Sequence, residues 1–128
     1  MVEQKKKILI VDDEPEFAKL IKTRLTAEGY LVDTAEDGQQ GLDKVKACPD
    51  LVILDVMMPN LGGIEFAKII KESPQTAKIP IIFLTAKEDE QTRIDGIRSG
   101  ADYFLTKPFD SAELLEIIKK LVHRNALD

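Results

Sequence analysis

The chain has 128 residues, a length that suits one domain with a single hydrophobic core. Its 44% apolar and 32% charged content exclude a disordered chain, and no apolar run approaches membrane-spanning length. The formal net charge of −5 gives no general attraction to nucleic acid. Cys48 is the single cysteine, so no intramolecular disulfide can form, and a reducing, cytoplasmic setting is expected.

Short apolar runs alternate with segments of helical periodicity along the first half of the chain. In order, the pattern predicts a strand at 7–11, a helix at 15–28, a weaker strand at 30–34, a short helix that opens at Asp37-Gly38 and ends before Pro49, and a strand at 51–54. The first helix is expected to carry four apolar residues on one face, Phe17, Leu20, Ile21 and Leu25, and to end at Gly29.

The second half continues the same alternation. After Gly62-Gly63, a helix is expected to carry Ile64, Phe66, Ala67, Ile69 and Ile70. The pattern then predicts a strand at 80–84, a polar helix at 88–98 ended by Gly100, a strand at 102–105, and a last helix capped by Asp110 or Ser111.

Five strand–helix units in succession predict an α/β fold with right-handed crossovers and a five-stranded parallel sheet. The usual doubly wound order for five strands is 2-1-3-4-5, the flavodoxin-like (βα)₅ topology. We therefore expect one domain over residues 1–128. This strand order puts the switch point between the first and third strands, where ligands bind in such sheets.

Polar residues follow the strand ends that this topology gathers on one edge. Asp12-Asp13 follow the first strand, Asp55 the third, Thr85 the fourth, and Lys107 the fifth. Each aspartate alone is more readily explained as a loop or helix-cap residue. The five residues together, each after its own strand, favour a functional site.

These residue types suit phosphoryl transfer. Clustered carboxylates repel one another, and a hard divalent cation such as Mg²⁺ relieves that repulsion through oxygen ligands. The carboxylate of Asp55 can act as a nucleophile and form an aspartyl phosphate. Lys107 offers a compact positive charge and Thr85 a hydroxyl donor for the phosphoryl oxygens.

Four short motifs have the order and spacing of a known family: Asp12-Asp13, Asp55 followed by Met58-Pro59, Thr85-Ala86, and Lys107-Pro108-Phe109. Together they resemble the receiver domain of two-component response regulators, from Lys7 to about Val122. The resemblance implies that Asp55 is the phosphoacceptor. It also implies that Mg²⁺ or Mn²⁺ is bound directly by Asp13, Asp55 and the backbone carbonyl of Met57, and by Asp12 through a water molecule.

The resemblance also implies how the phosphoryl group is sensed. Thr85 and Lys107 are expected to contact it, and a cis peptide bond is expected between Lys107 and Pro108. Receivers usually carry an aromatic residue three positions before the lysine, and Phe104 occupies that position without a tyrosine hydroxyl. An alternative interpretation of Phe104 is a core strand residue, because aromatic residues favour strands.

Two other segments depart from the simplest pattern. Gly62 stands where aspartate is more usual before the third helix, so a looser loop is expected there. The charged segment from Lys87 to Arg98 has few apolar anchors and contains Gly96. It fits either a segment that shifts on activation or an ordinary solvated edge helix.

As a receiver, the domain is expected to be a signalling switch rather than a turnover enzyme. The resemblance implies a bacterial, cytoplasmic protein that a histidine kinase or histidine phosphotransfer protein phosphorylates on Asp55. Phosphorylation is expected to alter the face made by the fourth helix, fifth strand and fifth helix. The resemblance further implies a downstream effector domain or target protein and allows a phosphorylation-dependent dimer. No direct contact with nucleic acid or membrane is expected.

Three alternatives compete with this interpretation. A Mg²⁺-dependent phosphohydrolase usually carries a second aspartate two residues after the nucleophile, where this chain has Met57. A non-phosphorylated pseudo-receiver would lack some of the five site residues. A flavin carrier shares the topology, but Glu14-Pro15-Glu16 after the first strand would repel a phosphate group.

Overall fold

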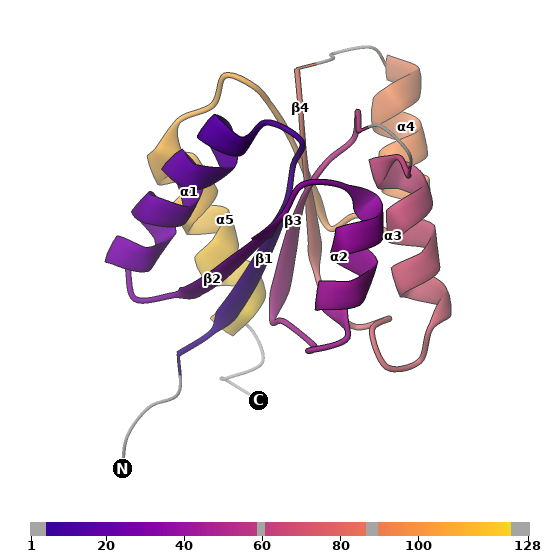
Figure 1. Cartoon of the computed structure of the whole chain (residues 1–128). Helices are drawn as coiled ribbons and strands as arrows, with labels where there is room; N and C mark the ends of the chain where they lie inside the picture. Colours follow the sequence, from indigo (N-terminus) through magenta and orange to yellow (C-terminus); the bar gives the residue numbers. More distant parts are fainter. Residues whose placement is uncertain (1–4, 59–60, 87–89, 124–128) are drawn as a thin grey trace.

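The computed structural model describes residues 5–58, 61–86 and 90–123. Strands and helices alternate along the described chain (Figure 1). The strands are β1 (Lys7–Val11), β2 (Leu31–Ala35), β3 (Leu51–Asp55), β4 (Ile81–Thr85) and β5 (Tyr103–Thr106). The helices are α1 (Pro15–Ala27), α2 (Gly38–Val45), α3 (Gly63–Glu72), α4 (Glu90–Arg98) and α5 (Ser111–His123). Every predicted strand is confirmed to within one residue at each end.

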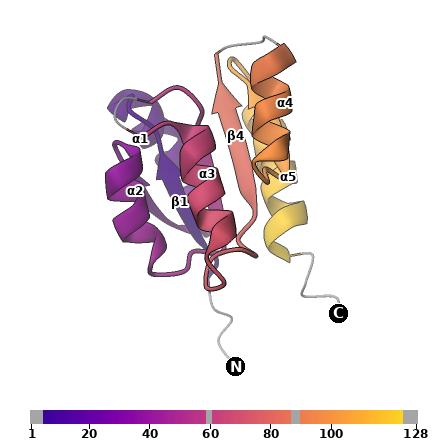
Figure 2. The same ribbon diagram turned by 90° about the vertical axis from the view of Figure 1, so that its right-hand side faces the viewer.

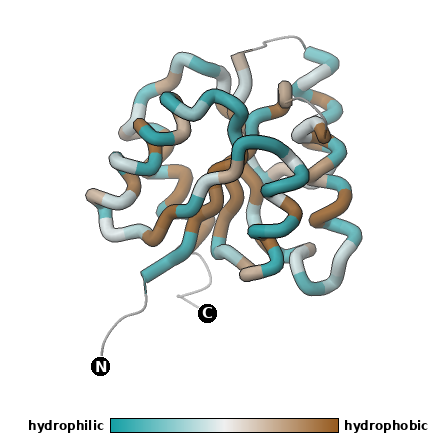
Figure 3. Tube along the Cα trace, viewed as in Figure 1, coloured by the Kyte–Doolittle hydropathy of each residue, from teal (hydrophilic) through white to brown (hydrophobic). Residues whose placement is uncertain are grey.

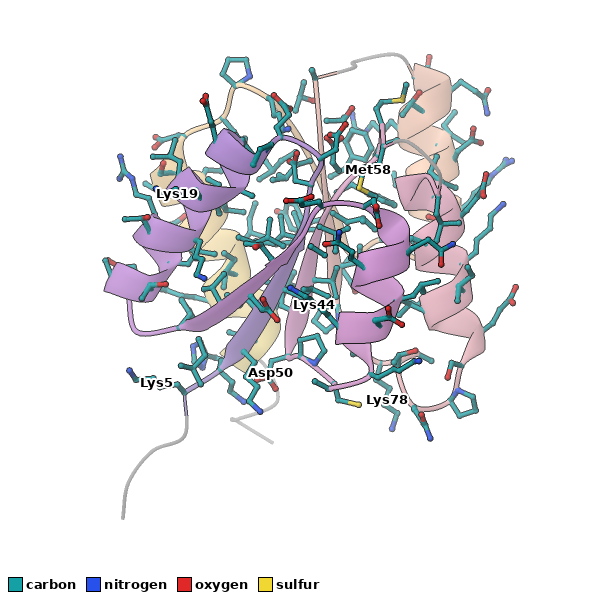
Figure 4. The ribbon with its side chains drawn as sticks, viewed as in Figure 1. Lys5, Lys19, Lys44, Asp50, Met58 and Lys78 are labelled. Carbon is teal, nitrogen blue, oxygen red and sulfur yellow. The ribbon has the colours of Figure 1, made fainter. Side chains whose placement is uncertain are left out.

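The five strands form one parallel sheet in the order β2-β1-β3-β4-β5, which confirms the predicted topology. The register pairs Val11 of β1 with Leu54 of β3, and Asp55 of β3 with Leu84 of β4. The carboxyl ends of the central strands therefore lie level with one another. Figure 4 agrees with this polarity: Met58, just after β3, lies at the upper edge, whereas Lys5, Asp50 and Lys78, each before a strand, lie at the opposite end.

Helices cover both faces of the sheet, and each face has its own apolar core. The core residues of α1 and α5 pack on one face and those of α2 and α3 on the other (Figure 1). All five residues of both β3 and β4 are buried, as expected for strands covered on both sides. The apolar strands accordingly lie at the centre of the tube in Figure 3, with more hydrophilic residues on the surrounding helices.

Local capping explains where several elements begin and end. The side chain of Asp37 accepts a hydrogen bond from the backbone N–H of Gln40 at 2.9 Å, and α2 begins there. The side chain of Asp110 accepts a hydrogen bond from the backbone N–H of Ala112 at 3.0 Å. Of the two predicted N-cap residues of α5, Asp110 and Ser111, the N-cap is therefore Asp110. Gly29 follows α1 with φ of 97°, a left-handed conformation that favours glycine.

Leu20 is predicted to share one apolar face of α1 with Phe17, Ile21 and Leu25, and that assignment was wrong because its side chain is exposed. Leu20 of α1 is 57% exposed and Ile69 of α3 is 42% exposed. A helix lying on a sheet buries only a stripe of its surface. In α1 that stripe contains Ala18, Ile21 and Leu25, and a residue next to Ile21 in sequence points about 100° away around the helix.

A second group of predictions concerns the fourth helix. The predicted start at residue 88 lies outside the described residues, and the helix is described from Glu90. Its buried residue is Gly96, while Ile97 is 55% exposed. The sparse anchoring expected from the sequence is therefore present. No helix in the described parts of the chain is long and apolar enough to cross a membrane.

The edge strand β2 is protected by a side chain. Lys44 of α2 lies beside β2 (Figure 4), and its ammonium donates hydrogen bonds to the backbone carbonyl of Thr34 and to the carboxylate of Asp33. The Lys44–Asp33 distance is 3.1 Å, and this contact lowers the pKa of Asp33 despite the opposing effect of burial. A charged residue on a sheet edge discourages pairing with another chain.

Replacing Cys48 by glycine is expected to raise the free energy of unfolding by about 0.5–1 kcal/mol. Cys48 is exposed and has φ of 54°, a left-handed conformation that strains any residue with a Cβ atom. Urea unfolding of wild type and variant measures the change. Cys48→Ala is the control, because it removes the thiol but retains the strain. Equal stabilisation by alanine and glycine would show that the backbone is not the cause.

Candidate functional site

The acidic residues after β1 and β3 lie together at the carboxyl edge of the sheet. Carboxylate oxygens of Asp12, Asp13, Glu14 and Asp55 all lie within 4.8 Å of one another. Three of these residues line an open cavity of about 480 Å³, whose lining is Asp13, Glu14, Asp55, Met57, Ala86 and Lys107. The sheet register explains the cluster, since β1 and β3 are hydrogen-bonded neighbours that end side by side.

Asp55 is the last residue of β3 and is only 6% exposed. Its Oδ1 accepts a hydrogen bond from the backbone N–H of Met57 at 3.1 Å, and its Oδ2 lies 3.7 Å from Nζ of Lys107. Burial and the neighbouring charges of Asp12 and Asp13 raise the pKa of Asp55 to about 6, although the Met57 N–H and Lys107 oppose the rise. The carboxylate is therefore held in a fixed orientation, and its charged form is destabilised.

Asp12 follows β1 and is 2% exposed. Its Oδ1 accepts a hydrogen bond from the backbone N–H of Glu14 at 2.8 Å, and its Oδ2 lies 3.2 Å from Nζ of Lys107. Burial raises the pKa of Asp12, while the Glu14 N–H and the lysine charge limit the rise. Asp13, by contrast, is exposed at the rim of the cavity.

Lys107 brings the positive charge of the site. It follows β5, its peptide bond with Pro108 is cis, and its backbone N–H donates to the carbonyl of Thr85 at 2.7 Å. Its ammonium hydrogen-bonds to Asp12 and to Glu14 Oε1, the latter at 3.1 Å. Burial by itself would lower the pKa of Lys107, but the surrounding carboxylates outweigh it and raise the pKa.

An aromatic pair supports this ammonium from the side of α1. Nζ of Lys107 lies 4.0 Å from the centroid of the Phe17 ring, within the range of a cation–π interaction. The Phe17 ring in turn meets Phe109 edge-to-face, with centroids 6.0 Å apart. The lysine head is thus surrounded by groups that fix its position.

Thr85 and Phe104 belong to β4 and β5, which lie on the other side of β3 from β1. Thr85 ends β4 and is 0% exposed, and its neighbour Ala86 lines the cavity in its place. Phe104 of β5 is partly buried against Phe83, with ring centroids 6.2 Å apart. Gly96 of α4 makes room for both rings, because a Cβ there would lie 3.1 Å from Phe83 and 3.2 Å from Phe104. The core interpretation of Phe104 therefore has structural support.

Two glycines shape the loop from β3 to α3. A Cβ at Gly63 would lie 2.3 Å from the carbonyl oxygen of Asp55, so only glycine permits this close approach of α3 to the end of β3. Gly62 is the N-cap of α3, in extended conformation, and provides no side-chain cap. A Cβ at Gly62 would meet only the carbonyl oxygen of Val56 at 3.8 Å, an ordinary contact.

Two residues near Lys107 were not predicted to belong to this site: Glu14 and Phe17. From the sequence, Glu14 is expected only to repel a phosphate group, and Phe17 only to lie on the apolar face of the first helix. The sequence does contain a signal for Glu14, because it directly follows Asp12 and Asp13 at the end of a strand. A third acidic residue in that run can reach the same positive charge as the first two. Nothing in the sequence places Phe17 next to a lysine ninety positions later.

The donor set fits a hard divalent cation. Among the residues that the structure describes, the clustered groups are all carboxylates, and oxygen ligands of this kind suit Mg²⁺ or Mn²⁺ rather than a softer metal. Two of the carboxylates are buried, so their mutual repulsion is poorly screened by solvent. In the structure, the ammonium of Lys107 forms ion pairs with three of the four clustered carboxylates, those of Asp12, Glu14 and Asp55.

Comparison with known proteins agrees with the fold. The response regulator receiver domain family matches residues 8–119. The chain belongs to this family, whose members are phosphate-accepting switches of two-component signalling. It is 44% identical over 118 residues to the response regulator ArlR of Staphylococcus aureus, a match that covers 91% of this chain and 52% of ArlR. The chain therefore spans about half the length of the curated relatives it matches.

Solved structures show the same architecture. The receiver domain of the Francisella response regulator 1452 is 35% identical, with a TM-score of 0.86, and the match covers 94% of this chain and 98% of that one. The chemotaxis protein CheY4 of Vibrio cholerae is 34% identical, with a TM-score of 0.86, over 92% of this chain and 99% of that one. These similarities favour neither a phosphohydrolase nor a flavin carrier.

Replacing Asp55 by asparagine is expected to raise the free energy of unfolding of the metal-free protein at pH 7 by about 2–3 kcal/mol. The pKa of Asp55 is about 6 in the folded protein against an ordinary value of 3.8, so ionisation above pH 6 costs stability. As the pH falls from 6 to 4, the folded state takes up this proton first and wild-type stability rises relative to the variant. Urea unfolding with a chelator, across this range, measures the difference.

Asp43→Asn is the matched control for this pH dependence. Asp43 is an exposed carboxylate on α2, paired with Lys46 at 3.7 Å. Its replacement is expected to change stability little and by a similar amount at each pH. An advantage of Asp55→Asn that stays constant from pH 4 to pH 8 would contradict the assignment of the raised pKa to Asp55.

Replacing Gly62 by aspartate is expected to stabilise the protein by about 0.5–1 kcal/mol. The new carboxylate can accept a hydrogen bond from the first turn of α3 and reduces the entropy of the unfolded chain. Gly63→Ala is the contrasting variant, since its methyl group collides with the end of β3 and should cost about 1–3 kcal/mol. Thermal unfolding of both variants measures the effects, and stabilisation by Gly63→Ala would show that the close approach is not as described.

Proposed function

We propose that Asp55 of this chain accepts a phosphoryl group and that residues 1–128 form one receiver domain. The observation that carries the proposal is the cluster of four carboxylates within 4.8 Å, at a sheet edge that also holds Lys107. Oδ1 of Asp55 is engaged by the N–H of Met57, so Oδ2, which faces Lys107, is the oxygen available for bond formation.

The same proposal assigns a metal to the cluster. Asp13, Asp55 and the backbone carbonyl of Met57 would hold Mg²⁺ or Mn²⁺ directly, and Asp12 would act through a bound water. A divalent cation at this position supplies charge neutralisation for the oxygens of an incoming phosphoryl group. The buried carboxylates of Asp12 and Asp55 supply the negative charge that favours its binding, and Asp13 at the rim leaves an open approach from solvent.

The remaining residues would respond to the modification. Lys107 would donate to one phosphoryl oxygen, and the hydroxyl of Thr85 to another. Because Thr85 is fully buried, its contact with the phosphoryl group requires a local movement at the end of β4. We infer that this movement is relayed to the face formed by α4, β5 and α5, with Phe104 packed beneath α4. Such a change is a shift in the equilibrium between two conformations. Its size is limited by how much better the phosphoryl group is bound in one conformation than in the other.

The partners follow from the family rather than from any contact in the structure. We propose that a histidine kinase or a histidine phosphotransfer protein donates the phosphoryl group, and that an effector domain or a target protein reads the switched face. Phosphorylation would also control dimer formation through that face. The domain would assist its own phosphorylation and dephosphorylation without turning over an external substrate.

Replacing Asp55 by alanine is expected to abolish Mg²⁺-dependent incorporation of phosphate from acetyl phosphate. Intact-mass spectrometry measures the addition of one phosphoryl group, and chelation of Mg²⁺ should abolish it in wild type as well. Asp43→Ala, which removes an exposed carboxylate on α2, should be labelled as wild type is. Full labelling of Asp55→Ala would show that Asp55 is not the phosphoacceptor.

Two further outcomes separate the competing functions. Failure of the wild-type protein to bind Mg²⁺ at millimolar concentration would favour a pseudo-receiver. Turnover of a phosphomonoester far above one equivalent per protein would favour a phosphohydrolase, although Met57 at the position of the expected acid/base cannot transfer a proton.

A further inference from the structure

The ammonium of Lys107 is held by one short segment of the chain. Its two hydrogen-bond acceptors are Asp12 at 3.2 Å and Glu14 at 3.1 Å, and its aromatic contact is Phe17 at 4.0 Å. All three residues belong to the segment from the end of β1 into the first turn of α1. Lys107 itself follows β5, at the other side of β3 and β4 in the sheet. The lysine therefore reaches over Asp55 toward β1.

Asp55 is the most distant of the carboxylates that Lys107 contacts. The separation of 3.7 Å from Nζ to Oδ2 is an ion pair without a hydrogen bond. A lysine ammonium has three donors, and Asp12 and Glu14 accept from two of them. One donor is left for a phosphoryl oxygen on Asp55, but Nζ must move closer to Asp55 to use it, and the contacts with Asp12 and Glu14 oppose that movement.

Asp12 and Glu14 differ in how easily they release the lysine. The Asp12 side chain is 1% exposed, and its other oxygen is fixed by the Glu14 N–H, so it stays next to the site. The Glu14 side chain is 64% exposed and can turn into solvent without losing hydration. Glu14 is therefore the exchangeable partner, and the strength of its contact determines how readily Lys107 leaves.

We propose that Glu14 is a positioning residue that retains Lys107 on the β1 side in the unphosphorylated protein, so that release of this contact accompanies phosphorylation of Asp55. The inference rests on the proposed function of Asp55. In this proposal Glu14 slows the phosphorylation of Asp55, because its contact holds Lys107 away from the phosphoryl group. An ion pair with an exposed partner is weak, so the restraint corresponds to about a two- to fivefold effect on the rate.

The step itself is an ordinary group transfer. With acetyl phosphate as donor, the bond between Asp55 Oδ2 and phosphorus forms while the bond from phosphorus to the acetate oxygen breaks. Acetate leaves with the electron pair of that bond, and no proton is transferred to or from Asp55. Lys107 moves from Glu14 toward the transferred phosphoryl oxygens, whose charge it balances. Loss of the Glu14 contact removes one competitor for that movement.

The test compares phosphorylation rates of wild type, Glu14→Gln and Glu16→Gln at saturating Mg²⁺, with acetyl phosphate as donor and intact mass as readout. Glu16 is exposed in the first turn of α1, so its variant removes the same charge two residues away. Glu14→Gln is expected to be phosphorylated about two- to fivefold faster than wild type, and Glu16→Gln at the wild-type rate. Salt near 1 M should reduce the difference between wild type and Glu14→Gln, because it screens the ion pair.

A second measurement does not depend on catalysis. In metal-free protein, the NMR resonances of the Lys107 side chain, assigned with a Lys107→Arg variant, should shift in Glu14→Gln and not in Glu16→Gln. Equal rates and unshifted resonances in Glu14→Gln would overturn the proposal. A tenfold loss of Mg²⁺ affinity in Glu14→Gln, without faster phosphorylation, would also overturn it and identify Glu14 as a metal ligand. If wild type takes up no phosphate at all, the proposed function of Asp55 fails, and this inference fails with it.

Discussion

The balance between buried carboxylates and one lysine is the constraint on which the rest of the site depends. The parallel sheet ends β1 and β3 side by side, so Asp12 and Asp55 are buried next to each other at its edge. Two buried carboxylates destabilise each other unless a positive charge lies between them. Lys107 supplies that charge from β5, within 3.2 Å of Asp12 and 3.7 Å of Asp55. The four carboxylates outnumber the single ammonium, so the site keeps an excess of negative charge that a divalent cation would offset.

The two sides of the site differ in how firmly they are built. On the β1 side, Phe17, Phe109 and the hydrogen bonds of Asp12 hold the lysine head within a network of short contacts. On the β4–β5 side, α4 lies beside β4 and far from α2 (Figure 2), and its buried residue is a glycine. Gly96 permits close packing of α4 over the rings of Phe83 and Phe104 but adds no side chain to that packing. Regions with few buried apolar contacts open at lower free energy than the rest of a domain, and α4 buries fewer apolar side chains than α5 does.

Much of the fold could be predicted because apolar patterning and turn residues act locally. The runs at 51–55 and 81–85 are continuously apolar up to a terminal aspartate or threonine, and only a sheet covered on both faces accommodates such strands. Periodicity was less informative for the helices. It placed Leu20 on the same face of α1 as Ile21 and Leu25, although Leu20 lies outside the narrow stripe that contacts the sheet. The width of that stripe depends on how a helix packs against its neighbours, and the sequence of the helix alone does not reveal that packing.

By itself the sequence determined the alternation of strands and helices, the edge of the sheet that carries the site, and the residue types that meet there, because parallel strands joined by helices end at a common edge. The strand order was predicted only as the usual one for such a fold, and the structure confirmed it. The sequence did not determine which acceptors hold Lys107, because that choice depends on distances between residues far apart in the chain. Only the tertiary structure placed Glu14 at 3.1 Å from the ammonium and Phe17 beneath it. It also explained Gly63 and Gly96, whose missing side chains are required by close approaches to Asp55 and to two aromatic rings. Such contacts arise from packing in three dimensions. Side-chain volume and charge compensation there decide which of several similar residues makes a given contact.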